Sequence, residues 1–272
     1  KLLHKVSERI SLKAAAMACG KCFLCRNGNI QICDSKRSIG WGIDGAFAPY
    51  LVMPEKLLHK VSERISLKAA AMAEPCAIVA HQLLERTGVR PGDYVAVMGM
   101  GAIALIAAQM AKAAGASRVV MCGCESDIGV RLAAAERLGC CDRFIHVQKE
   151  DTAAVIYDET GNIGADVVVE ASGAEAAIGN AILSARKTGR ICAIGLTAKE
   201  KVSIPWNVAM QKVLDIQFNM SSSYNGWCMA LKMLESGVLS VEEMIRVMKL
   251  EEWESAFSKL ERGEAIKILL EC

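Results

Sequence analysis

Aromatic residues, prolines and unbalanced charge are all scarce in this chain. Phe, Trp and Tyr make up 5% of the 272 residues, and there are only five prolines. The formal net charge is +2, and acidic and basic residues are interspersed, so the chain lacks the basic stripe typical of nucleic-acid-binding proteins. It does not open on a secretory signal pattern. We therefore expect a cytoplasmic protein that binds neither nucleic acid nor membrane.

Long uncharged apolar runs are also few, with one exception at residues 94–111, YVAVMGMGAIALIAAQMA. This run is almost long and apolar enough to span a bilayer. The alternative is a buried parallel strand, a glycine turn and a buried helix. The two glycines, Gln109 and the turn residues 90–93 before the run favour this alternative.

Cysteine is abundant, and four of the twelve cysteines lie within fifteen residues, in CGKCFLCRNGNIQIC. The spacing C-x2-C-x2-C-x7-C lets neighbouring thiolates converge on one tetrahedral ion, as a closed structural zinc site requires. The alternatives are a cysteine-rich loop without metal and, less favoured, a disulfide framework. The remaining cysteines lie in apolar runs or adjacent to each other, which suits reduced thiols in a cytosol. The predicted zinc ligands are Cys19, Cys22, Cys25 and Cys33.

Residues 1–18, KLLHKVSERISLKAAAMA, recur without change at residues 56–73. Natural repeat proteins carry diverged copies and usually three or more of them. The alternatives are a very recent duplication, an engineering or assembly artefact, and an error in the sequence. The second copy continues smoothly into AEPCAIVAHQ, so we interpret the first copy as the additional one.

From residue 93 onward, short apolar runs alternate with helical patterns, which predicts an α/β fold with a doubly wound parallel sheet. The residues before Pro75 are rich in turns and indicate part of a small β domain. The expected strands are 94–98, 118–122, 143–147, 165–170, 190–195, 213–219 and 265–270, and the expected helices are 102–114, 127–138, 152–159, 175–186, 226–235 and 251–261, with Asp127 as an N-cap.

The first of these strands is followed by Gly-Met-Gly-Ala-Ile-Ala. Gly99 would form the tight turn, Gly101 would let the backbone approach a pyrophosphate, and Ala104 would allow close packing of helix on strand. The pyrophosphate would lie at the helix N-terminus. The alternative is a glycine turn in another kind of α/β fold.

An acidic residue after the second strand would bind the adenosine ribose of NAD. The candidates are Glu125 and Asp127. An NADP site would favour a basic residue there, but Arg118 lies at the other end of the strand and Arg131 lies inside the next helix. NAD is favoured and NADP stays open.

Six segments in this order resemble one family: the cysteine loop, GIDGAFAPYLVMPE, AEPCAIVAHQ, GMGAIAL, VVVEASGA and GEAIKILL. The chain resembles the zinc-containing medium-chain alcohol dehydrogenases, in the sorbitol (polyol) and threonine dehydrogenase branch. The resemblance covers residues 19–272. It implies a Rossmann domain joined to a GroES-like β domain, with a catalytic zinc between them.

The resemblance assigns residues 19–75 to a partial GroES-like domain with a structural zinc lobe, 76–220 to the Rossmann domain and 221–272 to a return into the catalytic domain. Gly195 and Leu196 would lie along the nicotinamide. By the same comparison, Gly123 stands where the ribose acid is usual. A homodimer or homotetramer is implied, because residues 213–219 resemble a strand that pairs across a dimer.

Glu74 matches the acidic ligand of the catalytic zinc in the polyol branch. On its own this residue would be interpreted as a carboxylate stabilised by a helix N-terminus. His81 matches a position that packs rather than binds metal. The family's other catalytic-zinc groups, a cysteine and a His-Glu pair, precede the cysteine loop, where this chain carries the copy of residues 56–73, and His4 does not replace them.

Two functions follow as expectations. The first is an NAD(P)-dependent zinc dehydrogenase acting on a secondary alcohol or polyol, impaired because most catalytic zinc ligands are absent. The second is a non-catalytic dinucleotide-binding protein that retains the zinc lobe and the Rossmann domain. A zinc-finger-like interaction module is disfavoured, because the cysteine loop is a small part of the chain.

Overall fold

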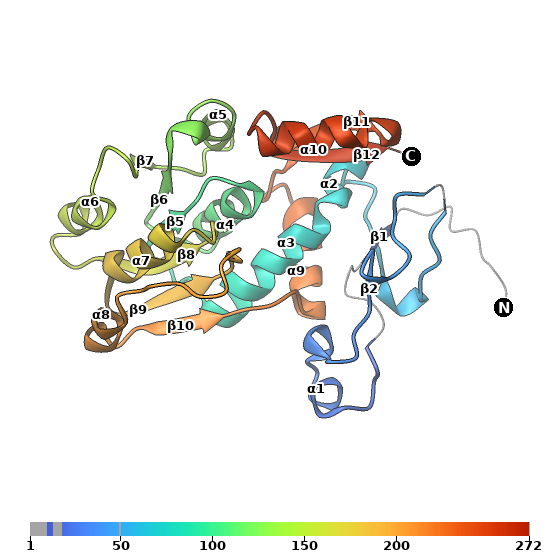
Figure 1. Ribbon diagram of the computed structural model, residues 1–272, viewed down its shortest axis with the longest axis horizontal. Coiled ribbons are helices and arrows are strands. Elements are labelled where there is room, and N and C mark those ends of the chain that lie inside the picture. The colour runs from blue at the N-terminus through green and yellow to red at the C-terminus, as the bar shows by residue number, and fades with distance from the viewer. Residues whose placement is uncertain (1–9, 13–17, 49, 272) are drawn as a thin grey trace.

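The computed structural model describes residues 10–12, 18–48 and 50–271, and its centre is a six-stranded sheet (Figure 1). All six strands run parallel, in the order β10-β9-β8-β5-β6-β7. The strands are β5 (Tyr94–Met98), β6 (Arg118–Gly123), β7 (Arg143–His146), β8 (Ala165–Glu170), β9 (Ala185–Ala193) and β10 (Asp215–Phe218). The predicted doubly wound α/β fold is therefore confirmed.

The strand order reverses between β5 and β8, which are neighbours in the middle of the sheet. The chain runs outward from β5 through β6 to β7, and then from β8 through β9 to β10. Doubly wound sheets bind their ligands at the carboxyl ends of the strands on either side of such a reversal. A ligand site is therefore expected at the turn after β5 and the loop after β8.

Helices cover both faces of the sheet (Figure 1). Alternate residues of β5 enter different cores: Val95 and Val97 belong to one apolar cluster, and Ala96 and Met98 to the other. A strand buried on both faces reads as a continuous apolar run, which explains the composition of β5, β6 and β8. The covering helices are α4 (Ala102–Ala113), α5 (Val130–Arg137), α6 (Thr152–Glu159), α7 (Glu175–Ser184) and α8 (Trp206–Lys212).

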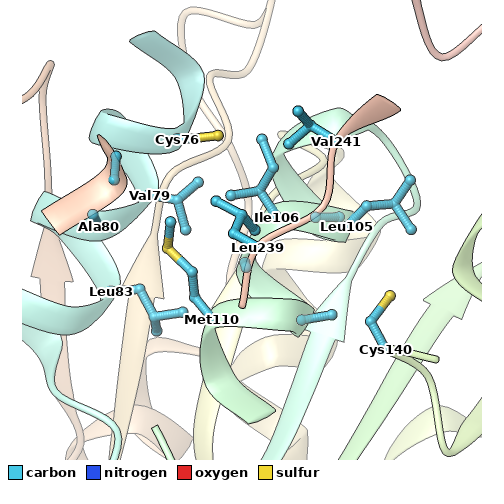
Figure 2. Packing of buried hydrophobic residues seen from close by; sticks show 14 of the residues in the cluster. Cys76, Val79, Ala80, Leu83, Leu105, Ile106, Met110, Cys140, Leu239 and Val241 are labelled. Carbon is cyan, nitrogen blue, oxygen red and sulfur yellow. The ribbon is translucent and has the colours of Figure 1, made fainter. Parts of the chain in front are cut away.

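A second group of helices packs between this sheet and the rest of the chain. α2 (Leu67–Ala71), α3 (Ala73–Val79) and the π-helix η3 (Ala80–Thr87) run together, and α9 (Tyr224–Glu235) packs along them. Figure 2 shows Val79, Leu83 and Met110 packed with Leu239 in one apolar cluster. Small residues bring the helix axes close, so a glycine of α9 lies directly on the backbone of α3.

The remaining segments are short. The stretch before α2 holds β1 (Ile10–Leu12), α1 (Phe23–Arg26), η1 (Ile30–Ile32), β2 (Ser38–Ile39), β3 (Gly42–Ile43), η2 (Glu55–Leu57) and β4 (Leu58–Lys60). The end of the chain holds η5 (Glu242–Met244), β11 (Ile245–Lys249), η6 (Leu250–Glu252), α10 (Trp253–Glu261) and β12 (Lys267–Glu271). β11 and β12 pair in parallel as a separate two-stranded sheet.

The duplicated sequence adopts two structures. Residues 10–12, Ile-Ser-Leu, form β1, which pairs antiparallel with β4. The same three residues at 65–67 lead into α2, where Ser66 is the N-cap and accepts a hydrogen bond from the backbone N–H of Ala69. The interpretation of residues 1–18 as the additional copy also concerns residues 1–9 and 13–17, which lie outside the described residues.

Several expected boundaries were wrong. The helix expected from 127 begins at Val130, and Asp127 ends a short 3-10 helix, η4 (Glu125–Asp127). The strand expected at 190–195 is longer and starts at Ala185, because the helix before it ends at Ser184. Val213 caps α8 in the left-handed conformation rather than opening β10. The sequence patterns also missed α2, α8 and β11, whose lengths of five to seven residues give too few repeats for a periodic signal.

The apolar run at residues 94–111 is divided between strand β5 and helix α4, as the alternative to a membrane span required. In the part of the chain that the structure describes, no helix has the length and apolar character needed to cross a bilayer.

The contact between α9 and α3 can be tested at Gly226. A Cβ there would lie 2.7 Å from the Ala77 carbonyl oxygen and 3.0 Å from the His81 Cβ. We expect Gly226→Ala to lower the free energy of unfolding by about 1–3 kcal/mol, because the helices must separate. Chemical denaturation measures it. Gly129→Ala is the matched control, since a Cβ at Gly129 meets no atom within 4 Å, and equal effects of the two changes would contradict the packing argument.

Candidate functional site

The four loop cysteines come together at the start of α1. The Sγ atoms of Cys19 and Cys25 are 3.9 Å apart, those of Cys22 and Cys33 are 3.8 Å apart, and all four lie within 4.8 Å of one another. A zinc–sulfur bond of about 2.3 Å in a regular tetrahedron places the sulfurs about 3.8 Å apart, whereas a disulfide brings them to about 2.05 Å. The arrangement fits a four-thiolate zinc ion and excludes a disulfide between these pairs.

The loop backbone prepares these thiols for a metal ion. The N–H of Cys22 donates to Cys19 Sγ at 3.3 Å, and the N–H of Cys25 points at Cys22 Sγ at 3.5 Å. Backbone N–H groups of Lys21 and Cys22 lower the pKa of Cys19 to about 6, while burial raises the pKa of Cys25 to about 12. Zinc would supply the charge that lets all four ionise.

The glycine turn after β5 has the geometry of a dinucleotide-binding turn. Gly99 has φ of 114°, and a Cβ there would lie 3.3 Å from the Ser172 Cβ in the loop after β8. Gly101 is the N-cap of α4, and no atom lies within 4 Å of the place that its Cβ would take. Ala104 is fully buried. The turn thus leaves open space at a helix N-terminus, which suits a pyrophosphate.

The loops after β8 and β9 are packed backbone against backbone at the same edge of the sheet. The N–H groups of Ile194 and Gly195 both donate to the Glu170 carbonyl at 2.9 Å. The Glu170 carboxylate accepts from the backbone N–H groups of Ser172 and Gly173. A side chain at Gly195 would collide with Gly173, so this glycine is needed for the packing, and Leu196 beyond it is 78% exposed.

The end of strand β6, where an acidic ribose ligand is expected, has no room for a side chain. A Cβ on Gly123, the last residue of β6, would lie 2.6 Å from Met100 Cγ and 2.9 Å from Phe144 Cε2. Asp127 is buried, and both of its carboxylate oxygens have partners: Cys124 on one and Arg131 on the other. Of the two predicted ribose ligands, only Glu125 presents an exposed carboxylate.

Sequence patterns missed the partners of Glu125, which come from the end of β7. His146 Nε2 and Lys149 Nζ each lie 2.9 Å from Glu125 Oε2. The pairing register of Gly123 with His146 places these strand ends side by side. A charged run after the third strand, HVQKED, was the available signal, because carboxyl ends of parallel strands meet at one edge.

Glu74 lies in the first turn of α3, and burial raises the pKa of its carboxyl group, partly opposed by Lys267. Its side chain has no hydrogen bond to any described residue. His81 is buried and pairs with Glu85, Nδ1 to Oε2, at 2.6 Å, as a packing residue would. Over the described ranges, the cysteine loop is the single place where three or more potential ligand groups converge. The described residues around Glu74 therefore do not fit a catalytic zinc ion.

Comparison with known proteins identifies the family. A family model described as zinc-binding dehydrogenase matches residues 102–236, and one described as the alcohol dehydrogenase GroES-like domain matches residues 4–63. D-arabitol-phosphate dehydrogenase of Enterococcus avium is 32% identical over 98% of this chain and 75% of its own length. The chain belongs to the zinc-containing medium-chain alcohol dehydrogenases. Sorbitol dehydrogenase of Halalkalibacterium halodurans is also 32% identical, over 97% of this chain and 76% of its own, which supports the predicted sorbitol dehydrogenase branch of the family.

Solved structures agree with this assignment. Alcohol dehydrogenase TADH from Thermus sp. ATN1 superimposes with a TM-score of 0.87 at 29% identity, covering 96% of this dehydrogenase and 78% of its own chain. A structure from Sinorhizobium meliloti 1021 that holds NADP gives a TM-score of 0.83 at 25% identity, covering 92% and 72%. The predicted family and fold are thus confirmed.

The open space at Gly101 gives a direct test of dinucleotide binding. Gly101→Val should abolish NAD binding by filling the place of the pyrophosphate, while the unfolding temperature stays within about 2 °C because nothing in the fold is displaced. Isothermal titration calorimetry and thermal unfolding measure the two effects. Gly129→Val is the control. Unchanged NAD affinity in Gly101→Val would contradict the assignment of the turn.

Proposed function

We propose that this chain is an NAD(P)-dependent zinc dehydrogenase that transfers hydride between a secondary alcohol or polyol and the nicotinamide ring. The observation that carries the proposal is the Gly99–Gly101 turn at the reversal point of a parallel sheet. The identity to D-arabitol-phosphate and sorbitol dehydrogenases supports the polyol as substrate class. NAD(P) supplies the hydride acceptor.

Different residues of the chain would then bind different parts of the cofactor. The N-terminus of α4 at Gly101 would bind the pyrophosphate through backbone N–H groups. Glu125 would accept hydrogen bonds from the ribose of NAD. Gly195 and the exposed Leu196 would border the nicotinamide, because they lie in the loop that follows β9, at the same edge of the sheet as the glycine turn.

We further propose the division into 19–75 and 221–272 as parts of the catalytic domain and 76–220 as the dinucleotide-binding domain. The ion pair of Arg64 with Glu235 and the stacking of His59 on Trp227 support it, since both contacts join the two outer parts of the chain. Cys19, Cys22, Cys25 and Cys33 would hold a structural zinc ion, which stabilises the loop without taking part in the reaction.

The second candidate function is dinucleotide binding without catalysis. It is supported by the surroundings of Glu74, where no second or third metal ligand lies among the described residues. A single carboxylate does not hold zinc tightly enough for Lewis-acid chemistry, which normally uses three protein ligands. We therefore propose Glu74 as a catalytic-zinc ligand whose partner ligands do not lie among the described residues.

A homodimer or homotetramer is proposed on the same grounds. β10 is an edge strand of the described sheet, and Phe218 at its end is 75% exposed. An exposed edge strand is a surface that another strand can pair with.

We also propose a reducing, cytoplasmic location. The eleven described cysteines are all free thiols, which supports it.

Zinc content tests the structural site. The purified chain should hold one zinc ion, and Cys22→Ser should lose it and unfold at a lower temperature, because a structural zinc ion contributes folding free energy directly. Elemental analysis and thermal unfolding measure this. Cys228→Ser, at a half-buried thiol outside the loop, should keep the metal. A Cys22→Ser variant with full zinc and unchanged stability would refute the site.

Turnover separates the two candidate functions. Lewis acidity contributes several kcal/mol to hydride transfer, and each 1.4 kcal/mol is about tenfold in rate. We expect this chain to oxidise sorbitol or butanediol at least about a thousandfold more slowly than the sorbitol dehydrogenase relative, with NADH formation as the measurement. NADH production at the relative's rate, unaffected by Glu74→Ala, would refute both the role of Glu74 and the proposed impairment.

A further inference from the structure

A pocket with three arginines lies at the amino edge of the sheet, away from the glycine turn. Its volume is about 340 Å³, and its lining includes Arg86, Arg90 and Arg190 together with Asp215 and Gln217. We call it the arginine pocket. A volume of this size is in the range of small-molecule sites.

Strand pairing builds one wall of the arginine pocket. Arg190 of β9 lies opposite Asp215, and Cys192 lies opposite Gln217 on the edge strand β10 (Figure 1). Side chains that are paired in this way, or two residues apart along a strand, lie on the same face of a sheet. Because Asp215 is the first residue of β10, this wall is at the amino edge, whereas the glycine turn follows the carboxyl end of β5.

The end of helix η3 forms the opposite wall. Arg86 and Thr87 are the last two residues of η3, and Arg90 follows in the turn that leads to β5. Burial raises the pKa of the Cys192 thiol to about 12, and a hydrogen bond from Thr87 and the charge of Arg86 act in the opposite direction. The helix end with Arg86 therefore lies close to β9.

A buried ion pair fixes the turn between these two walls. Arg190 is 8% exposed, and its guanidinium donates to the Asp93 carboxylate at 2.7 Å and to the Gly88 carbonyl oxygen at 2.6 Å. The Asp93 carboxylate also accepts from the backbone N–H of Arg90 at 2.7 Å. Because Arg190 and Asp93 neutralise each other, the unbalanced positive charge of the pocket comes from Arg86 and Arg90.

Arg86 and Arg90 differ from most arginines of the structure in having no carboxylate partner. Neither guanidinium forms an ion pair or a hydrogen bond with another residue in the described part of the chain. The Asp215 carboxylate, exposed at the rim, likewise has no partner among those residues. Arginines paired with carboxylates elsewhere are Arg118, Arg131, Arg143 and Arg186.

We propose that the arginine pocket binds the phosphate group of a phosphorylated polyol or sugar, at a site separate from the dinucleotide. Arg86 and Arg90 would bind the phosphate oxygens, because the planar guanidinium fork matches phosphate and charge-assisted hydrogen bonds are strong. Asp215 repels a bare phosphate but accepts hydrogen bonds from hydroxyl groups. A phosphate ester that carries hydroxyls therefore fits the pocket better than inorganic phosphate. This site does not depend on the proposed dehydrogenase function.

Calorimetric binding to the full chain tests the inference with inorganic phosphate, sorbitol 6-phosphate and sorbitol as probes. Sorbitol 6-phosphate should bind at least about threefold more tightly than inorganic phosphate, and sorbitol should not compete with either. Arg86→Gln and Arg90→Gln should each weaken both phosphates about tenfold, because a charge-assisted contact is lost. Arg246→Gln is the matched control, since Arg246 is an exposed arginine of β11 that also lacks a partner among the described residues.

The carboxylate of the pocket gives a change in the opposite direction. Asp215→Ala should tighten inorganic phosphate about threefold, because a like charge is removed. The same change should abolish the preference for sorbitol 6-phosphate, because the hydroxyl acceptor is lost. Weaker binding of inorganic phosphate in Asp215→Ala would contradict the assignment of Asp215.

Arg86 also lies at the negative end of η3, where a cation stabilises a helix without any ligand. If this is its whole role, Arg86→Gln lowers the unfolding temperature and leaves phosphate affinity unchanged. That result, or equal weakening by Arg246→Gln, overturns the site.

Phosphate bound at the glycine turn is distinguished by Gly101→Val. Phosphate affinity should stay within about twofold in this variant, since distant sites act independently. Loss of phosphate binding in Gly101→Val, or no phosphate binding by the folded wild-type chain, overturns the arginine pocket and leaves the proposed function intact. A wild-type chain that binds phosphate at the arginines but does not bind NAD or NADP overturns the proposed function alone.

Discussion

Burial of the six-stranded parallel sheet on both faces is the constraint on which the rest of this structure depends. Because alternate residues of β5 enter opposite cores, a one-residue shift in register would move every side chain of the strand into the other core, where it does not fit the packing. The carboxyl ends of β5, β6, β8 and β9 are therefore fixed along one edge. The glycine turn, the ribose-side group and the Gly195 loop come together there although they are far apart in sequence.

The two candidate metal sites, the four-cysteine loop and the surroundings of Glu74, differ in how their ligands are brought together. The cysteine loop is local: fifteen residues carry all four thiols, and backbone N–H groups already point at the sulfurs. A site built around Glu74 would be composite, because a carboxylate in the first turn of a helix needs partners from other segments. The local site is formed in the described structure, and the composite one is not.

The ribose side of the sheet shows how packing displaces a functional group. Met100, Asp127 and Phe144 fill the space around Gly123, so a side chain at the strand end is sterically excluded. The exposed acidic side chain lies two residues on, at Glu125, where it meets His146 and Lys149 of the next strand end. The other candidate, Asp127, is buried. Its carboxylate accepts a hydrogen bond from the Cys124 backbone N–H and forms an ion pair with Arg131.

The sequence by itself determined the parallel α/β architecture, the cysteine loop and the glycine turn, because each depends on local spacing and on apolar runs that have one stable arrangement. Only the tertiary structure decided which of the two carboxylates is exposed at this edge of the sheet and which residues join it, since His146 and Lys149 reach Glu125 through strand pairing. The Ile-Ser-Leu sequence makes the same point. It is a strand at residues 10–12 and a helix start at 65–67, because a pairing partner exists in one place and a buried helix follows in the other.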